Sequence, residues 1–484
     1  MDQIISRLRE TLPQKLKEWG VPGLSCAIVR KGQVVYSGHF GYRDMESQIA
    51  PNDQTLYAIA STTKAMTATC VGILVDEGKL EWDKPVISYL PEFRMYDEYA
   101  TQHVTIRDML CHKTGVPRHD NTWYGDSGKT TKELVEGIRY LKPNKELRTK
   151  YEYNNLMFTT CGYIVERVSG MPWQEFMLKR IFEPLDMHRS FCTLGEFTGE
   201  DNKALPYVRD EDMPCRVPYL CFDGMAGCGT VNSTTEDMSR WLTMNLAGGI
   251  YNGKQIISRE SLSEIHLPQI LVNQGLNKEI PMKAYGFGWT VRAYRGSKVL
   301  DHTGGIDGFS SLVTLMPQED TGMVILVNRS GFNHHFSIAY AVYDYILGIT
   351  PIDWEGRINE DEKASRKAGD EANAHIDGMR NVKAAPSHPA EALTGVYVNA
   401  AYGQFTIEAS GRSDVFLEAA YHGQKLLICH NNNNTFDMAV EDEHRPVRTL
   451  LRFEVDISGA ISRLWVDLEP SLGEMIPFEP IKKT

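Results

Sequence analysis

The chain has 484 residues, of which 42% are hydrophobic and 24% are charged, and its formal net charge is −12. This length exceeds one typical core and predicts two or three domains, while the acidic balance argues against a nucleic-acid or anionic-membrane partner. The nine cysteines are irregularly spaced without a Cys-x-x-Cys or His-Glu-x-x-His motif, so we expect free thiols in a reducing compartment and neither a metal nor a cofactor.

The N-terminal residues predict a helix followed by a hairpin. Apolar residues recur at helical spacing over residues 2–19, and Pro13 should kink this segment or split it into two short helices. Two β-prone runs, 24–29 and 34–40, then meet at Lys31-Gly32, which indicates a hairpin. The N-terminus does not resemble a signal peptide, and the chain has no run of 18 apolar residues. We therefore expect a cytoplasmic protein, unless a leader has been removed.

The next segment carries a Ser61-x-x-Lys64 motif at the start of a predicted helix that stops at Gly78. One helical turn separates the two residues, so a hydroxyl and an amine share one face. A buried ammonium gives up its proton more readily than an exposed one, and such a pair can activate a serine without a histidine. The motif is expected by chance about once or twice in a chain of this length, and a helix-capping serine is the alternative interpretation.

Two further candidates follow in the helical part of the chain. A short helix over residues 105–110 leads to His112, which we interpret as a structural histidine bonded to the backbone. Tyr153 and Asn155 lie at the start of a helix predicted over residues 156–168. A tyrosine there can accept a proton and an asparagine can orient a substrate amide. The alternative interpretation is a loop tyrosine beside a helix N-cap.

A helix over residues 234–246 precedes a strand-rich region. We expect these late strands to join the early hairpin in one antiparallel sheet flanked by helices, and a helix over residues 334–347 to close the unit. The predicted strands cover residues 285–291, 299–305, 311–316 and 323–328.

The last part of the chain changes character. Residues 355–392 are charged and rich in alanine, which predicts a partly helical linker, and eight short alternating runs follow from residue 393. We therefore divide the chain into one large unit at 1–354, a linker at 355–392 and an all-β barrel at 393–484. The barrel sequence carries no catalytic cluster.

Three motifs in this order resemble the family of class C serine β-lactamases, penicillin-binding DD-peptidases, D-aminopeptidases and related esterases. The resemblance covers roughly residues 10–350 and implies an α/β (α+β) fold, with an antiparallel sheet between helices. It gains support from the segments 110–115, 285–289 and 304–309. The motifs are Ser61-x-x-Lys64, Tyr153-x-Asn155 and His302-Thr303-Gly304.

The resemblance implies acyl transfer through an acyl-enzyme. Ser61 would attack a carbonyl, and Lys64 and Tyr153 would share the movement of its proton; which of the two is the base stays open. Asn155 would hold a substrate amide, and Thr303 and Gly304 would line the substrate strand. The N–H groups of Ser61 and Gly305 would form the oxyanion hole, where such donors contribute about 2.7–4 kcal/mol each.

His302 departs from the class C pattern, which has lysine at that position. Histidine there is similar to the D-aminopeptidase, DD-peptidase and esterase branch, and we expect it to bind a substrate carboxylate as an imidazolium. The sequence therefore predicts a peptidase or amidase that acts on small peptides. The alternatives are a carboxylesterase or acyltransferase, and a penicillin-binding scaffold without turnover.

A second resemblance concerns the barrel. Residues 400–405, after a Gly-Val-Tyr strand, are similar to the lipocalin-like domain that is appended to some Ser-x-x-Lys peptidases. In that group the domain can form oligomers and restrict access to the active site. The resemblance thus implies a homo-oligomer through the barrel, and a peptide or other small molecule as the substrate.

Overall fold

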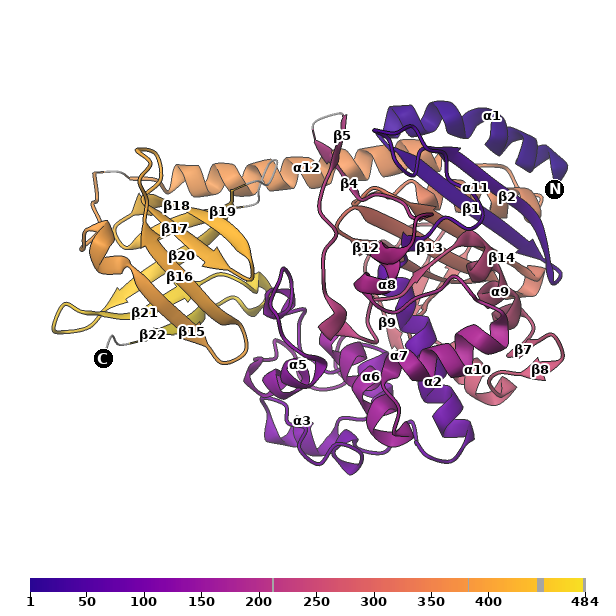
Figure 1. Cartoon of the computed structure of the whole chain (residues 1–484), viewed down its shortest axis with the longest axis horizontal. Helices are drawn as coiled ribbons and strands as arrows, with labels where there is room; N and C mark the ends of the chain where they lie inside the picture. Colours follow the sequence, from indigo (N-terminus) through magenta and orange to yellow (C-terminus); the bar gives the residue numbers. More distant parts are fainter. Residues whose placement is uncertain (211–212, 382, 442–447, 482–484) are drawn as a thin grey trace.

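The computed structural model describes residues 1–210, 213–381, 383–441 and 448–481. Figure 1 shows an eight-stranded sheet with helices on both faces, a long helix α12, and a closed eight-stranded barrel at the far end of that helix. The predicted fold class is confirmed.

The sheet joins strands from both ends of residues 1–350, as the sequence predicts. Its order is β2-β1-β14-β13-β12-β11-β10-β9, and every neighbouring pair is antiparallel, with Leu24 opposite Val327. Lys31 and Gly32 both have positive φ, which suits the tight hairpin turn between the first two strands. The strands are β1 (Gly23–Arg30), β2 (Gln33–Gly41), β9 (Ile270–Leu271), β10 (Met282–Tyr285), β11 (Thr290–Tyr294), β12 (Ser297–Ile306), β13 (Phe309–Met316) and β14 (Thr321–Val327).

The central strands are buried on both faces. Along β1, Cys26 and Ile28 pack with α1 (Asp2–Trp19) and α11 (His335–Ile346), whereas Ala27 and Val29 join the core of α2 and α9. Alternate side chains point to opposite faces of a strand, so near-continuous apolar strands here mean two helical layers.

The face of the sheet opposite α1 and α11 carries most of the helices. These helices lie between β2 and β9 in the chain: α2 (Thr63–Asp76), α3 (Glu98–His103), α4 (Ile106–Leu110), α5 (Thr131–Gly137), α6 (Asn155–Ser169), α7 (Trp173–Met177), α8 (Leu194–Gly199), α9 (Thr235–Leu246) and α10 (Arg259–Ile265). Three short antiparallel pairs accompany them: β3 (Tyr57–Ala58) with β6 (Asn232–Ser233), β4 (Tyr207–Asp210) with β5 (Met213–Arg216), and β7 (Ile250–Tyr251) with β8 (Lys254–Gln255). The predicted cap of α4 is confirmed, because Thr105 and Asp108 form a capping box.

The split into two helices at Pro13 and the single strand over residues 285–291 are both wrong. Pro13 does not divide the first segment: α1 is one helix from Asp2 to Trp19, whose apolar stripe, including Leu8, Leu12 and Leu16, is buried against the sheet. The run 285–291 is not one strand, because a turn at Gly286–Gly288 separates β10 from β11. Gly288 has φ 74°, and a Cβ there would lie 2.7 Å from the carbonyl carbon of Lys64, so this turn packs directly on α2.

Helix α12 (Trp354–Gly378) connects the sheet region to the barrel (Figure 1). Trp354 is buried at one end and its Nε1 donates to Tyr294 Oη at 3.2 Å. Ile376 is buried at the other end, where its carbonyl accepts a hydrogen bond from Asn431. The boundaries at 354 and 392 remain predictions.

The barrel contains the eight predicted strands and is closed, because β15 pairs with β22. The end of the predicted barrel region, residues 482–484, lies outside the described residues, as do residues 442–447 within it. The strands are β15 (Gly395–Asn399), β16 (Gly403–Ala409), β17 (Leu417–Tyr421), β18 (Gln424–Asn432), β19 (Thr435–Val440), β20 (Thr449–Val455), β21 (Ile461–Val466) and β22 (Ile476–Pro480).

All nine cysteines belong to the described residues, and each is a free thiol. Six of them are buried, as free cysteines usually are. Within the described ranges, every helix is too short or too polar to cross a bilayer.

Candidate active site

Ser61 lies in a single 3₁₀ turn, Ala60–Thr62, directly before α2. No side-chain cap bond closes the start of this helix, so the structure does not support a capping role for the serine. Ala60 has φ 47°, in the left-handed region that residues with a Cβ seldom adopt, and such strain is typical of functional turns. Lys64 follows one turn later, and its Nζ donates to Ser61 Oγ at 3.0 Å.

The Lys64 side chain is completely buried and has three hydrogen-bond acceptors around it. Besides Ser61, its Nζ donates to Asn155 Oδ1 and to the carbonyl of Cys228, each at 2.8 Å. An ammonium group has three protons, so the site satisfies all of them without an adjacent carboxylate. If Lys64 gives up one proton, it can become a base that is already aimed at Ser61.

Asn155 reaches Lys64 because its neighbour caps the helix. Asn154 is the N-cap of α6, and its side chain accepts a hydrogen bond from the N–H of Met157. Asn155 accepts from Lys64 through Oδ1 and donates through Nδ2 to Asp120 Oδ1 at 2.9 Å. Both ends of this amide are therefore engaged, and the geometry favours a role in holding Lys64 over a free substrate-binding amide.

Tyr153 completes the contacts of the serine. Its Oη donates to Ser61 Oγ at 3.0 Å, so Ser61 faces Lys64 and Tyr153 at the same distance. Two cations lie over the tyrosine ring, since Lys64 Nζ and Arg118 Cζ are each 5.0 Å from the ring centroid. These cations would stabilise negative charge that develops on the phenol oxygen during proton transfer.

His112 has the structural role that the sequence predicts. Its Nδ1 accepts a hydrogen bond from the N–H of Asn154 at 3.2 Å, which ties the histidine to the start of α6. Burial and the nearby cations, Lys64 foremost, hold the pKa of His112 well below its usual range. The ring is a neutral platform that packs against Tyr153, with ring centroids 4.3 Å apart.

Strand β12 brings the third motif beside the serine turn. The pairing between β11 and β12 ends at Thr290 and Asp301. Beyond Asp301, the edge of β12 that β11 leaves unpaired faces the turn that carries Ser61. Thr303 and Gly305 are exposed, whereas His302 and Gly304 are buried. Gly305 is exposed on this edge, at the position expected for the oxyanion hole.

Gly304 is required by this close approach. A methyl group on Gly304 would overlap the carbonyl oxygen of Ile59 and Ser311 Oγ, whereas a Cβ on Gly305 would meet nothing within 4 Å. We expect Gly304→Ala to lower the free energy of unfolding by about 1–3 kcal/mol, since backbone would have to move. Gly305→Ala is the matched control. Chemical denaturation of both variants tests this, and equal stabilities would contradict it.

His302 is a neutral side chain. Its Nδ1 lies 2.6 Å from the carbonyl oxygen of Thr303, which can only accept, so Nδ1 carries the proton and Nε2 accepts from Tyr285 Oη at 2.8 Å. Burial, together with the charge of Lys64, lowers the pKa of His302 to about 3. The expected imidazolium that binds a substrate carboxylate is therefore not supported, because the ring is buried and both nitrogens are occupied.

The pKa of His302 has a consequence for stability. Its folded pKa, about 3, lies below the ordinary value of 6.5, so between these values the unfolded chain binds more protons and acidification favours unfolding. We expect His302→Gln to weaken this pH dependence by up to about 1.4 kcal/mol per pH unit. Urea denaturation at pH 7 and pH 5 measures the difference. His266 and His335 are buried with similar pKa values, so they should preserve part of the pH dependence of stability in the variant. An unchanged slope in the variant would count against a neutral His302.

Three contributors to the site escape the sequence analysis: Arg118, Asp120 and the carbonyl of Cys228. Arg118 Nε donates to Asp120 Oδ2 at 2.6 Å, and Asp120 holds Asn155. No local motif marks these residues, and a backbone carbonyl has no sequence signature. The Pro-Arg-His-Asp run after the 110–115 segment is the signal that could have drawn attention to them.

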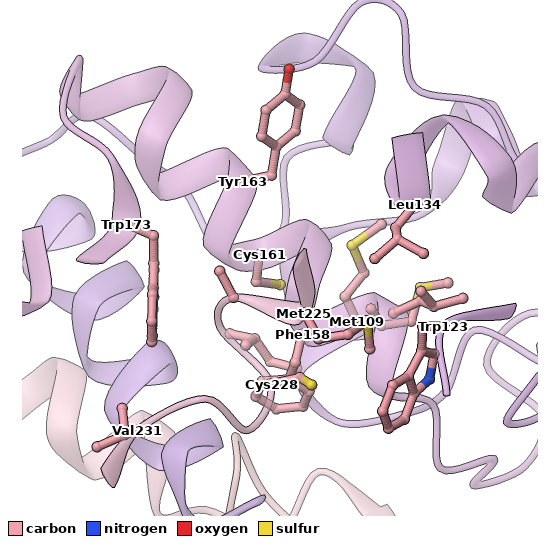
Figure 2. Close-up of a cluster of buried hydrophobic side chains, with 14 of the residues drawn as sticks. Met109, Trp123, Leu134, Phe158, Cys161, Tyr163, Trp173, Met225, Cys228 and Val231 are labelled. Atoms are coloured by element: carbon pink, nitrogen blue, oxygen red, sulfur yellow. The ribbon is translucent and has the colours of Figure 1, made fainter. Parts of the chain in front are cut away.

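A cluster of buried hydrophobic side chains packs around the elements that hold Lys64. Figure 2 shows Phe158 and Cys161 of α6 near Met225, Cys228 and Trp123, all within the main hydrophobic core. This packing fixes α6 and the loop that ends in Cys228, and these two elements provide two of the three acceptors of Lys64.

Known proteins share both parts of this architecture. The Beta-lactamase family model matches residues 4–345, and a domain of unknown function (DUF3471) matches residues 379–480. Unguisins hydrolase ungD′ of Aspergillus campestris is 28% identical over 84% of this chain and 78% of its own length. Unguisins hydrolase ungD of Aspergillus violaceofuscus is 24% identical, with 95% and 87% covered.

Two further similarities are more distant. Protein flp of Staphylococcus aureus (strain N315) is 24% identical over 66% of this chain and 62% of its own length. The solved structure of the octameric penicillin-binding protein homologue from Pyrococcus abyssi has a TM-score of 0.63 and 22% identity. It covers 98% of this chain and all of its own, so the same fold extends over both parts.

Proposed function

Because the chain belongs to the Beta-lactamase family and is a serine hydrolase, we propose that it cleaves amide bonds in small peptides through an acyl-enzyme on Ser61. The observation that carries this proposal is the position of Ser61 Oγ, 3.0 Å from both Lys64 Nζ and Tyr153 Oη. Two proton-transfer groups beside one nucleophile suit a reaction in which a proton first leaves the serine and then reaches a poor leaving group such as an amine.

The proposed reaction has two stages. Ser61 Oγ attacks the substrate carbonyl while its proton moves to the pair of Lys64 and Tyr153, and the N–H groups of Ser61 and Gly305 bind the oxyanion. The C–N bond then breaks, the departing amine takes that proton, and the acyl group remains on Ser61. Water attacks this ester and its proton passes to the same pair. The bond between the acyl carbon and Ser61 Oγ then breaks, Oγ takes that proton, and the free acid leaves.

The surroundings of the serine suggest which peptides fit. A small pocket of about 20 Å³ lies beside the end of β12, where an apolar wall includes Ala58, Phe222 and Phe309. A carboxylate on the substrate would meet Arg118 rather than His302, because the Arg118 side chain is about half exposed and permanently charged.

A substrate panel tests the proposal. We expect turnover of D- or L-aminoacyl amides and small peptides, no turnover in Ser61→Ala, and slow β-lactam hydrolysis. Two relatives bear the name unguisins hydrolase, so unguisins belong in the panel. Cleavage of acyl esters without measurable amide cleavage would replace this proposal with the carboxylesterase or acyltransferase alternative. The complete absence of turnover and of a Ser61 adduct would favour a scaffold.

We also propose that the chain assembles into a homo-oligomer in which the lipocalin-like barrel takes part. The support is the similarity to a penicillin-binding protein homologue that is described as octameric. Light scattering of the full chain would measure its mass in solution. The proposed cytoplasmic location rests on the nine free thiols, which suit a reducing compartment.

A further inference from the structure

Residues 118–129, here called the bridging loop, lie between the barrel and the active site. Asn121 Nδ2 donates to the carbonyl of Leu468 at 2.9 Å, and Lys129 Nζ donates to the carbonyls of Thr122 and Ala401. The N–H of Asp126 donates to the carbonyl of His422 at 2.8 Å. The loop is thus bonded to the barrel along most of its length.

The strongest attachment is at His119, which is fully buried. Its N–H donates to Glu469 Oε2 at 2.7 Å, and its Nε2 donates to the carbonyl of Lys142 at 3.0 Å. Nδ1 is therefore the acceptor of the Tyr402 hydroxyl, at 2.5 Å. His119 has φ 48°, and a histidine persists in this left-handed conformation only where its surroundings hold it. Glu469 and Tyr402 of the barrel provide much of that hold.

Asp120, the residue after His119, contacts Asn155, which in turn holds Lys64. Asp120 Oδ1 accepts from Asn155 Nδ2 and from Trp123 Nε1, each at 2.9 Å. Trp123 is anchored in the buried cluster of Figure 2. Because Asn155 Oδ1 holds Lys64, the orientation of this amide depends on the position of Asp120.

The loop also reaches the opposite side of the site. Tyr124 Oη lies 2.8 Å from both carboxylate oxygens of Asp307, which follows Gly305 by two residues. One loop therefore contacts the groups beside Lys64 and the end of the strand that carries Gly305.

We propose that Asp120 is a positioning residue for Lys64, and that the barrel residues Tyr402 and Glu469 keep it in place by holding His119. The barrel is thereby a structural part of the active site. This inference rests on the proposed role of Ser61 as nucleophile, but it does not depend on which bond the protein cleaves.

The test measures how fast Ser61 of the full chain is acylated by a fluorophosphonate probe, with binding constant and rate constant resolved separately. We expect Asp120→Ala to slow the acylation step on the order of 10- to 100-fold while probe binding changes little, because Lys64 is displaced but Ser61 and the edge of β12 stay in place. Asp120→Asn keeps an oxygen acceptor for Asn155 and should recover part of the rate. The barrel double variant Tyr402→Phe/Glu469→Ala should slow the same step.

A combined variant separates positioning from general damage. If the barrel acts through Asp120, adding Tyr402→Phe/Glu469→Ala to Asp120→Ala should cause no further loss of rate. Glu474→Ala is the matched control, because it breaks the ion pair with Lys142 in the same interface without touching His119. Its rate should match that of the wild type.

Two results would overturn this inference alone: wild-type acylation rates in Asp120→Ala, or losses that multiply in the combined variant. Absence of labelling in the wild type would overturn both the proposed function and this inference. Thermal unfolding of each variant is recorded in parallel. A slow step at unchanged melting temperature supports positioning, whereas rate losses that only follow melting temperature contradict it.

Discussion

Ser61→Ala is expected to remove covalent labelling and to lower turnover by a factor on the order of 10⁴ to 10⁶, as in other serine hydrolases that lose their nucleophile. The side chain is a hydrogen-bond partner of Lys64 and Tyr153 and is not a cap of α2, so its loss should leave the fold intact. Intact-mass spectrometry after treatment with a fluorophosphonate or a β-lactam reports the adduct directly.

A matched serine controls for indirect effects. Ser263 is exposed on α10, and Ser263→Ala should label and turn over like the wild type. Residual turnover in Ser61→Ala within about 10-fold of the wild type, or an adduct on another residue, would show that Ser61 is not the nucleophile.

Tyr153→Phe is expected to slow acylation on the order of 10²- to 10⁴-fold, the usual contribution of a general acid–base group. The ring stays between the same cations and only the hydroxyl that donates to Ser61 is lost, so stability should change little. Lys64→Met should cause a loss of similar size. In contrast to Tyr153→Phe, it should also destabilise the fold by about 1–3 kcal/mol, because buried acceptors lose their donor.

The double variant distinguishes a shared proton path from separate roles. If Lys64 and Tyr153 act as one coupled pair, Lys64→Met/Tyr153→Phe should be about as slow as the slower single variant. Pre-steady-state acylation at several pH values measures this. Full activity of Tyr153→Phe would assign proton transfer to Lys64 alone, and losses that multiply would mean that the two groups act independently.

The parts of the site that local spacing can encode are predictable from the sequence. Ser61 and Lys64 are one helical turn apart, and the Tyr153-x-Asn155 pair lies at a helix start, so the fold only had to bring two short motifs together. The sheet is predictable for a similar reason, since β1 and β14 are mostly apolar, as strands buried on both faces are.

The rest depends on contacts between distant residues. Asp120 acts on Asn155 across 35 positions, and no periodic pattern records such a pair. The sequence shows that residue 302 is a histidine, but its neutral state follows from burial and from the charge of Lys64, both of which exist only in the folded chain. Gly288 is expected in a strand but lies in a turn, because its contact with Lys64 exists only in the folded chain.

The hydrogen bond between His119 and Glu469 joins residues 350 positions apart in the sequence. A ribosome adds about 5–20 residues per second, so roughly 20–70 s separate the synthesis of the two partners. During that interval Ser61, Lys64 and Tyr153 have all been made, but the barrel that holds the bridging loop has not. A nascent chain of this protein should therefore carry its nucleophile well before the nucleophile is held in place, and full hydrolytic activity should develop only after Glu469 and the other barrel residues have been made.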